Sequence, residues 1–255
     1  MRIIISPAKK MNMDTDSLDF TSLPQFLPEA ETIKCQLQAM NAKELQALWR
    51  CNDSIAALNL ERLRGMDLQK NLTPAILAYE GLQYRYMAPG VFERGHYAYI
   101  DEHLRILSGF YGLLRTFDGV VPYRLEMQAK LSVAGSKDLY DYWGDRLAKQ
   151  LAAETDLILN LASKEYSQAV KAGLPVQVRW VECIFAEGQD GKLVQKGTRC
   201  KMARGQMVRF LAEHNITSVE EIKAFAQLGY VYSQQHSSAD RFVFIKEAAA
   251  QADGR

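Results

Sequence analysis

Short apolar runs alternate with longer amphipathic stretches along the chain, and this alternation predicts a mixed α/β fold. Three apolar runs, at residues 2–5, 104–107 and 157–160, have the length of strands and end in small or polar residues. The second run also fits the beginning of a helix. Gly109 and Gly112, which follow it, favour a strand and a turn instead.

The amphipathic stretches predict helices, many of them in a helical region at about residues 29–88. Apolar residues recur at helical spacing over 29–40, and Asn41 with Glu44 has the pattern of a capping box. Thr73 followed by Pro74 is typical of a helix N-terminus. Further predicted elements are a helix from Asp53, strands at 176–186 and 192–198 joined by a hairpin at Asp190 and Gly191, a helix at 201–214, a helix from Thr217, and an antiparallel pair at 229–232 and Arg241–Lys246.

Composition and charge narrow the class of protein. Of 255 residues, 48% are hydrophobic and 24% are charged, which is typical of a folded domain, and we predict one domain over 1–255. Lys and Arg number 31 against 30 Asp and Glu, which excludes a uniformly basic nucleic-acid binder but leaves a local basic face open. No apolar run approaches the roughly 20 residues of a membrane span, and no signal-peptide pattern begins the sequence. We therefore expect a cytoplasmic protein without a membrane partner.

The cysteines and histidines give no sign of a metal centre or a cofactor. The four cysteines are widely spaced, without a Cys-x-x-Cys pair or a histidine at zinc-ligand spacing, so we expect reduced thiols, no metal site and no cofactor. Cys200 lies between Arg199 and Lys201, and these charges could lower its thiol pKa. Redox sensing at Cys200 is therefore a minor hypothesis.

Polar residues follow each of the three predicted strands, where α/β proteins commonly bind ligands. The first strand runs into Ser6 and Lys9, the second into Ser108, and the third into Asn160 and Ser163. If the three ends lie side by side, these residues line one crevice with helix N-termini that favour anions. Ordinary strand-to-helix turns are the alternative explanation of each motif taken alone.

Two charged segments could also bind an anion. In the segment 122–127, an extended backbone would place Arg124 and Glu126 on one face, either as a structural ion pair or as a ligand clamp. The stretch 195–210 contains five Lys and Arg residues and no acid. Such a stretch could contact phosphates, or it could be a solvated face or pair with acids elsewhere.

These motifs together resemble the YaaA family, the peroxide stress proteins. The resemblance covers about residues 1–245, and its motifs come in order. They are Ser6-Pro7-Ala8-Lys9, Leu104 to Gly109 with Tyr111 to Arg115, Pro122 to Met127, Leu139-Tyr140 with Trp143 to Asp145, Asn160 to Ser163 with Glu165-Tyr166, and Lys201 with Ala203 to Gly205.

The resemblance implies a cytoplasmic protein that limits damage by hydrogen peroxide and keeps free iron low. It also implies a single α/β domain of unusual topology, with a mixed sheet, surrounding helices and a positively charged cleft. A helix-hairpin-helix-like element that binds double-stranded DNA belongs to the same family picture. In this chain that element would lie at about residues 42–64.

Two functional hypotheses follow. The first is a peroxide stress protein whose basic cleft binds duplex DNA or another polyanion through phosphate contacts. Its contacts would be Lys9, Arg105, Arg124, Lys201 and Arg204.

The alternative is an enzyme of unknown reaction that acts on a small anionic metabolite. No catalytic motif is recognised, and the candidates for proton transfer or catalysis are Glu126, Tyr111 and Ser163. Its ligand pocket would contain Ser6, Ser108, Tyr123, Asn160 and Ser163. Direct iron storage is the weakest idea, because no cluster of His, Cys and carboxylates supports it.

Overall fold

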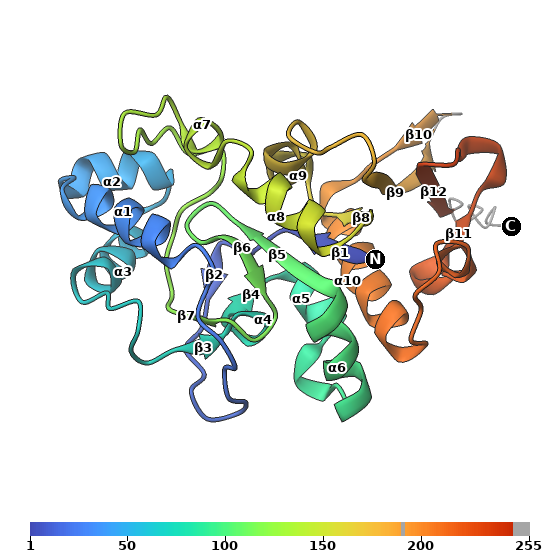
Figure 1. Cartoon of the computed structure of the whole chain (residues 1–255), viewed down its shortest axis with the longest axis horizontal. Coiled ribbons are helices and arrows are strands. Elements are labelled where there is room, and N and C mark those ends of the chain that lie inside the picture. The colour runs from blue at the N-terminus through green and yellow to red at the C-terminus, as the bar shows by residue number, and fades with distance from the viewer. Residues whose placement is uncertain (190–191, 247–255) are drawn as a thin grey trace, which may run out of the picture.

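A mixed, largely parallel sheet forms the centre of the computed structural model, which describes residues 1–189 and 192–246 (Figure 1). The strand order is β11-β12-β9-β8-β1-β5-β6, with β10 beside β9. From β12 to β5 all neighbours are parallel, whereas β6, β10 and β11 pair antiparallel. The strands of this sheet are β1 (Arg2–Ile5), β5 (Leu104–Ser108), β6 (Gly112–Arg115), β8 (Leu157–Leu161), β9 (Arg179–Gln189), β10 (Lys192–Val194), β11 (Tyr230–Tyr232) and β12 (Arg241–Lys246).

Helices cover both faces of this sheet. Figure 1 shows α8 and α9 on one side and α5, α6 and α10 on the other, with α1, α2 and α3 grouped at one end of the molecule. Two short antiparallel pairs, β2 with β4 and β3 with β7, lie outside the main sheet. The helices are α1 (Leu27–Gln38), α2 (Ala42–Trp49), α3 (Asp53–Arg64), α4 (Ala75–Ala78), α5 (Leu82–Met87), α6 (Arg94–His103), α7 (Leu139–Trp143), α8 (Arg146–Glu154), α9 (Lys164–Lys171) and α10 (Gly197–Glu213). The short pairs are β2 (Lys10–Met11), β3 (Thr73–Pro74), β4 (Tyr79–Glu80) and β7 (Gly119–Val120), and the 3₁₀ turns are η1 (Pro89–Val91), η2 (Glu221–Ala224), η3 (Gln227–Gly229) and η4 (Gln234–His236).

The strand β1 lies in the middle of the sheet and sets its register. Ile5 pairs with Ile106 of β5 on one side and with Leu161 of β8 on the other. Both Ile5 and its predecessor Ile4 are fully buried, because helices cover both faces of a largely parallel sheet. The register brings the carboxyl ends of β8, β1 and β5 to one edge of the sheet.

Most of the predicted elements are confirmed. The three apolar runs are strands, the last two strands form an antiparallel pair, and β9 and β10 form the arms of the predicted hairpin. The predicted turn at Asp190 and Gly191 lies outside the described residues. Asn41 caps α2, since its side chain accepts from the amide of Glu44 and the Glu44 carboxylate accepts in return from the Asn41 amide.

Three element predictions were wrong in their details. Thr73 does not cap a helix; it pairs with Val120 in β3, and its hydroxyl accepts from the amide of Asp14. The helix expected from Thr217 is only the 3₁₀ turn η2. The strand expected to continue to residue 198 stops at Val194, because α10 already begins at Gly197.

No helix in the described part of the chain is long and apolar enough to cross a membrane.

Candidate functional site

The carboxyl ends of β1 and β8 are joined by a pair of serines. Ser6 follows β1, and its hydroxyl accepts from the amide of Ser163 at 2.8 Å and donates to the Ser163 hydroxyl at 3.2 Å. Ser163 is the N-cap residue of α9, but its side chain makes no capping hydrogen bond. The first turn of α9 therefore keeps free amide donors beside this serine pair, an arrangement that favours an anion.

The segment 122–127 crosses the end of β5 in direct contact with Gly109. A β-carbon at Gly109 would lie 3.0 Å from backbone atoms of residues 125–127, so only glycine allows this approach. The segment is not a strand, but its side chains alternate as an extended chain requires. Tyr123 and Leu125 are buried, whereas Arg124 and Glu126 are half-buried on the other side.

Arg124 and Glu126 meet Lys9 at this edge of the sheet. One carboxylate oxygen of Glu126 lies 2.8 Å from Nζ of Lys9 and 3.8 Å from Nη2 of Arg124. The Lys9 side chain is 64% exposed, whereas that of Arg124 is 11% exposed. A carboxylate between two cations leaves one net positive charge, and it holds the arginine in place for a further partner.

Two buried donors on Arg124 and Trp49 have no hydrogen-bond partner among the described residues. They are Nε of Arg124 and the indole nitrogen of Trp49, which ends α2. Nη2 of Arg124 donates weakly to the carbonyl of Trp49 at 3.4 Å. Buried donors without acceptors are costly, so their presence here is typical of a site that a ligand or water completes.

We call the group Ser6, Lys9, Arg124, Glu126, Ser163 and Glu165 the strand-end site. Glu165 was not among our sequence candidates for catalysis, although it belongs to a motif on which the resemblance rests. Burial raises its pKa, and the nearby charge of Glu126 adds to the shift, while the amide of Gln128 and Lys9 oppose it. A carboxyl group whose pKa is raised is better suited to transfer a proton than an ordinary glutamate.

The buried hydroxyl groups of Ser108, Tyr123 and Tyr79 form a hydrogen-bonded chain next to the site. The hydroxyl of Ser108 accepts from the amides of Phe110 and Tyr111, so its own proton goes to the hydroxyl of Tyr123 at 2.6 Å. Tyr123 then donates to Tyr79 at 2.9 Å. Burial raises the pKa of Tyr123 to about 12, so these groups stay neutral and position the segment rather than bind an anion.

Two other predicted site residues are engaged with the protein itself. The Asn160 side chain is buried and accepts from the amide of Ala162, which closes the turn after β8. Tyr111 is fully buried, accepts from the amide of Val121, and has a pKa raised by burial. Both side chains therefore stabilise the fold. Neither the hydroxyl of Tyr111 nor the side-chain amide of Asn160 belongs to the group around Arg124.

The remaining predicted anion contacts do not lie with Lys9 and Arg124. Arg105 is the second residue of β5, near its amino end, and its side chain is only 6% exposed and paired with Glu154. On α10, Lys201 is exposed, whereas Arg204 is largely buried beside Cys183 and Cys200, and burial lowers its pKa. The structure thus separates the five contacts that the first hypothesis grouped together.

Three cations of the acid-free stretch 195–210 form ion pairs with glutamates outside it. Glu187 of β9 accepts from Lys196 at 3.3 Å and from Arg199 at 2.7 Å, and Arg209 pairs with Glu213. The expected lowering of the Cys200 pKa was wrong: burial raises it. Among residues 1–189 and 192–246, no three His, Cys, Asp or Glu side chains form a group that could hold a metal ion.

The chain is similar to one family model and to proteins of several bacteria. A family model described as "Peroxide stress protein YaaA" matches residues 1–236. A UPF0246 protein of Desulfitobacterium hafniense is 53% identical over 249 residues, which cover 98% of this chain and 99% of the relative. UPF0246 proteins of Pediococcus pentosaceus and Lachnoclostridium phytofermentans are 50% and 48% identical, each over 96% of this chain and over 98% and 96% of the relative. These matches confirm the resemblance inferred from the motifs: the chain belongs to the family of the peroxide stress protein YaaA.

Proposed function

We propose that this chain serves a cytoplasmic peroxide stress response by binding a small anionic molecule at the strand-end site. By binding or converting that molecule, the protein limits damage by hydrogen peroxide and keeps free iron low. The observation that carries the proposal is Arg124, whose Nε is buried without a partner among the described residues. A buried donor on a cation calls for an anionic acceptor.

The neighbouring groups suit such a ligand. Lys9 and Arg124 carry two positive charges against the one carboxylate of Glu126. The uncapped first turn of α9 begins at Ser163 and adds amide donors, while Glu165 is a carboxyl group with a raised pKa. An anion held by Arg124 and α9 would therefore meet a group able to transfer a proton. This supports an enzyme that acts on the anion, with Glu165 or Glu126 as the acid or base.

A thermal-shift screen with Arg124→Gln tests the proposal. The probes are phosphate, nucleotides, sugar phosphates and small carboxylates, each added to the full chain. We expect at least one probe to raise the melting temperature of the wild type and to lose most of this effect in the variant. Arg94→Gln is the matched control, because Arg94 is an exposed arginine of α6 without an ion pair among the described residues.

The same variants test the cellular role. In a strain that lacks this gene, the wild type and Arg94→Gln should restore growth in hydrogen peroxide, whereas Arg124→Gln should not. If no probe stabilises the wild type, or if Arg124→Gln responds and complements like the control, the proposal is wrong.

Duplex DNA is a second candidate ligand, favoured by the turn between α2 and α3. Arg50 lies in this turn and Lys43 in the first turn of α2; both are exposed without an ion pair in the described part of the chain, and both line a hollow of about 480 Å³. Arg50 has φ of 46°, which turns the chain sharply between the two helices. This corresponds to the helix-hairpin-helix-like element expected at residues 42–64. The protein would contact the DNA phosphates through Lys43 and Arg50 rather than through Arg105 or Arg204.

The salt dependence of DNA binding tests this second candidate. If Lys43 and Arg50 each contact one phosphate, the double variant Lys43→Glu/Arg50→Glu should lose about two units of the log–log salt slope, at roughly 0.9 per contact. Lys201→Glu, a charge reversal at an exposed lysine of α10, should leave the slope unchanged. Equal slopes for wild type and double variant would remove DNA from this surface.

A further inference from the structure

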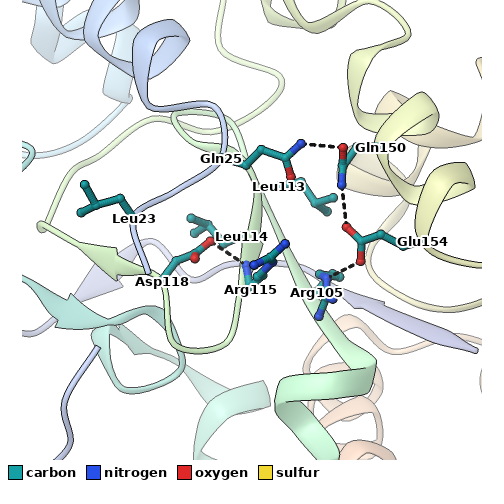
Figure 2. A pocket seen from close by; sticks show the side chains of 9 residues that line it. All are labelled: Leu23, Gln25, Arg105, Leu113, Leu114, Arg115, Asp118, Gln150 and Glu154. Carbon is teal, nitrogen blue, oxygen red and sulfur yellow. Dashed lines mark hydrogen bonds and ion pairs between the residues drawn. The ribbon is translucent and has the colours of Figure 1, made fainter. Parts of the chain in front are cut away.

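A pocket lies at the amino-terminal end of the same strands, opposite the strand-end site. It has a volume of about 270 Å³ and is bounded by β5, β6, α8 and the segment before α1. Figure 2 shows Arg105 and Arg115 next to each other on one side of it, with Gln25, Leu113 and Gln150 on the other. None of the residues that line this pocket belongs to the strand-end site, so the pocket is a separate feature of the fold.

The acidic side chains of the pocket already have partners. Both oxygens of Glu154 are used: Oε2 accepts from Arg2 at 2.9 Å and from Arg105 at 2.8 Å, and Oε1 accepts from Gln150. Both oxygens of Asp118 are used as well, by the hydroxyl of Ser22 and by the amide of Arg115. Burial raises the pKa of Asp118, while its hydrogen bonds from Ser22 and Arg115 oppose that shift.

The groups left over are donors on two arginines. Nε and Nη1 of Arg105 are taken by Glu154 and by the carbonyls of Asp101 and Leu104, so Nη2 remains without a hydrogen bond among the described residues. The guanidinium group of Arg115 has no ion pair in the part of the chain that the structure describes, although its backbone amide is bound to Asp118. Two guanidinium groups with free donors therefore face one small pocket.

We infer that this pocket binds a small organic carboxylate between Arg105 and Arg115. A planar carboxylate matches the fork of donors on a guanidinium group, and a buried arginine held by Glu154 is already oriented for it. Leu23 and Leu113 line the remaining wall, so the hydrocarbon part of the ligand has apolar side chains to contact. Phosphate would share the arginines but would gain nothing from the leucines.

Calorimetric titration of the full chain with short-chain mono- and dicarboxylates tests this inference. Inorganic phosphate and the neutral amides of the same acids are the comparison probes. Arg115→Gln should weaken carboxylate binding roughly tenfold or more, because a charge-assisted contact is lost. The substitution keeps the fold, since Arg115 is exposed and its backbone bond to Asp118 does not change.

Two further variants locate the bound anion. Arg94→Gln should leave the carboxylate affinity unchanged, and Arg124→Gln should also leave it unchanged, because Arg124 belongs to the strand-end site. A wild type that binds no carboxylate, or that binds phosphate as tightly, overturns the assignment. It is also overturned if Arg115→Gln binds like the wild type or if Arg124→Gln abolishes binding. These outcomes are independent of the proposed function, which depends on Arg124 alone.

Discussion

The two ends of the central sheet use the same motif, a glutamate between two cations, in different ways. At the amino end, Glu154 lies 2.9 Å from Arg2 and 2.8 Å from Arg105, and its other oxygen is bound by Gln150. At the carboxyl end, Glu126 lies 2.8 Å from Lys9 but 3.8 Å from Arg124, and Arg124 keeps an unpartnered donor. The glutamate side chains are similarly buried, at 12% and 17% exposed.

The two ends differ in how completely the glutamate and its arginine partner are hydrogen-bonded. Glu154 accepts three hydrogen bonds, and although burial opposes its ionisation, Gln150 and the two arginines lower its pKa. Beside Glu126, Nε of Arg124 has no hydrogen-bond partner among the described residues. The unpartnered Nε of Arg124 is therefore the observation on which the proposed ligand site at the carboxyl end rests.

The largest expected effect comes from breaking the ion pairs at the amino end. Glu154→Gln removes the negative charge between Arg2 and Arg105 and should lower the free energy of unfolding by about 3 kcal/mol, because Arg105 stays buried without a counter-charge. Glu126→Gln should cost only about 1 kcal/mol, because Lys9 is largely exposed and water replaces its partner. Urea unfolding of both variants measures the difference, and equal losses would contradict the comparison.

A smaller effect is expected where the segment 122–127 crosses β5. Gly109→Ala places a methyl group 3.0 Å from the backbone of residues 125–127 and should destabilise the fold by about 2 kcal/mol. It should also weaken any ligand response that depends on Arg124, since the segment must move. Gly95→Ala in α6 is the control, because a β-carbon there meets nothing within 4 Å. The close approach is unimportant if both variants unfold at the same urea concentration.

The smallest effect is a change in the pH dependence of stability. The folded pKa of Glu165 is raised, so its ionisation disfavours the folded state at pH values above that pKa, and this penalty vanishes below its unfolded pKa. Glu165→Gln stays neutral, so it should be more stable than the wild type at neutral pH and lose this advantage on acidification to about pH 4. Melting temperatures across this range measure it, with the exposed Glu102→Gln as control. An advantage that persists in acid would show that burial of the charge is not the cause.

The sequence was sufficient to predict the neighbourhood of the strand-end site but not its composition. Runs of buried residues that end in Ser6, Ser108 and Ser163 mark the carboxyl ends of strands, and parallel pairing brings such ends together. Trp49 and Glu165 could not be assigned in the same way. Trp49 reaches the site only because α2 ends beside the segment 122–127, which is a contact between residues distant in sequence.

Arg105 shows why a charge near a motif can be misplaced. It stands three residues before Ser108, so along a strand it lies about 10 Å from the carboxyl end. Its partner Glu154 ends a helix some fifty residues later, and no local pattern connects the two. Arg204 was misjudged for a related reason: its place on α10 was confirmed, but which side of that helix faces β9 depends on packing.

The position of β12 has a consequence for how the protein is made. This strand, residues 241–246, pairs in parallel with Glu182 to Glu187 of β9 and separates it from β11, so the order in the sheet is not the order of synthesis. A nascent chain that has not reached Arg241 therefore carries β9 with the edge that β12 covers still open. Open edges recruit other strands, so a ribosome that stalls in this interval would leave a product prone to aggregate. Residues 241–246 are thus what covers this edge of β9.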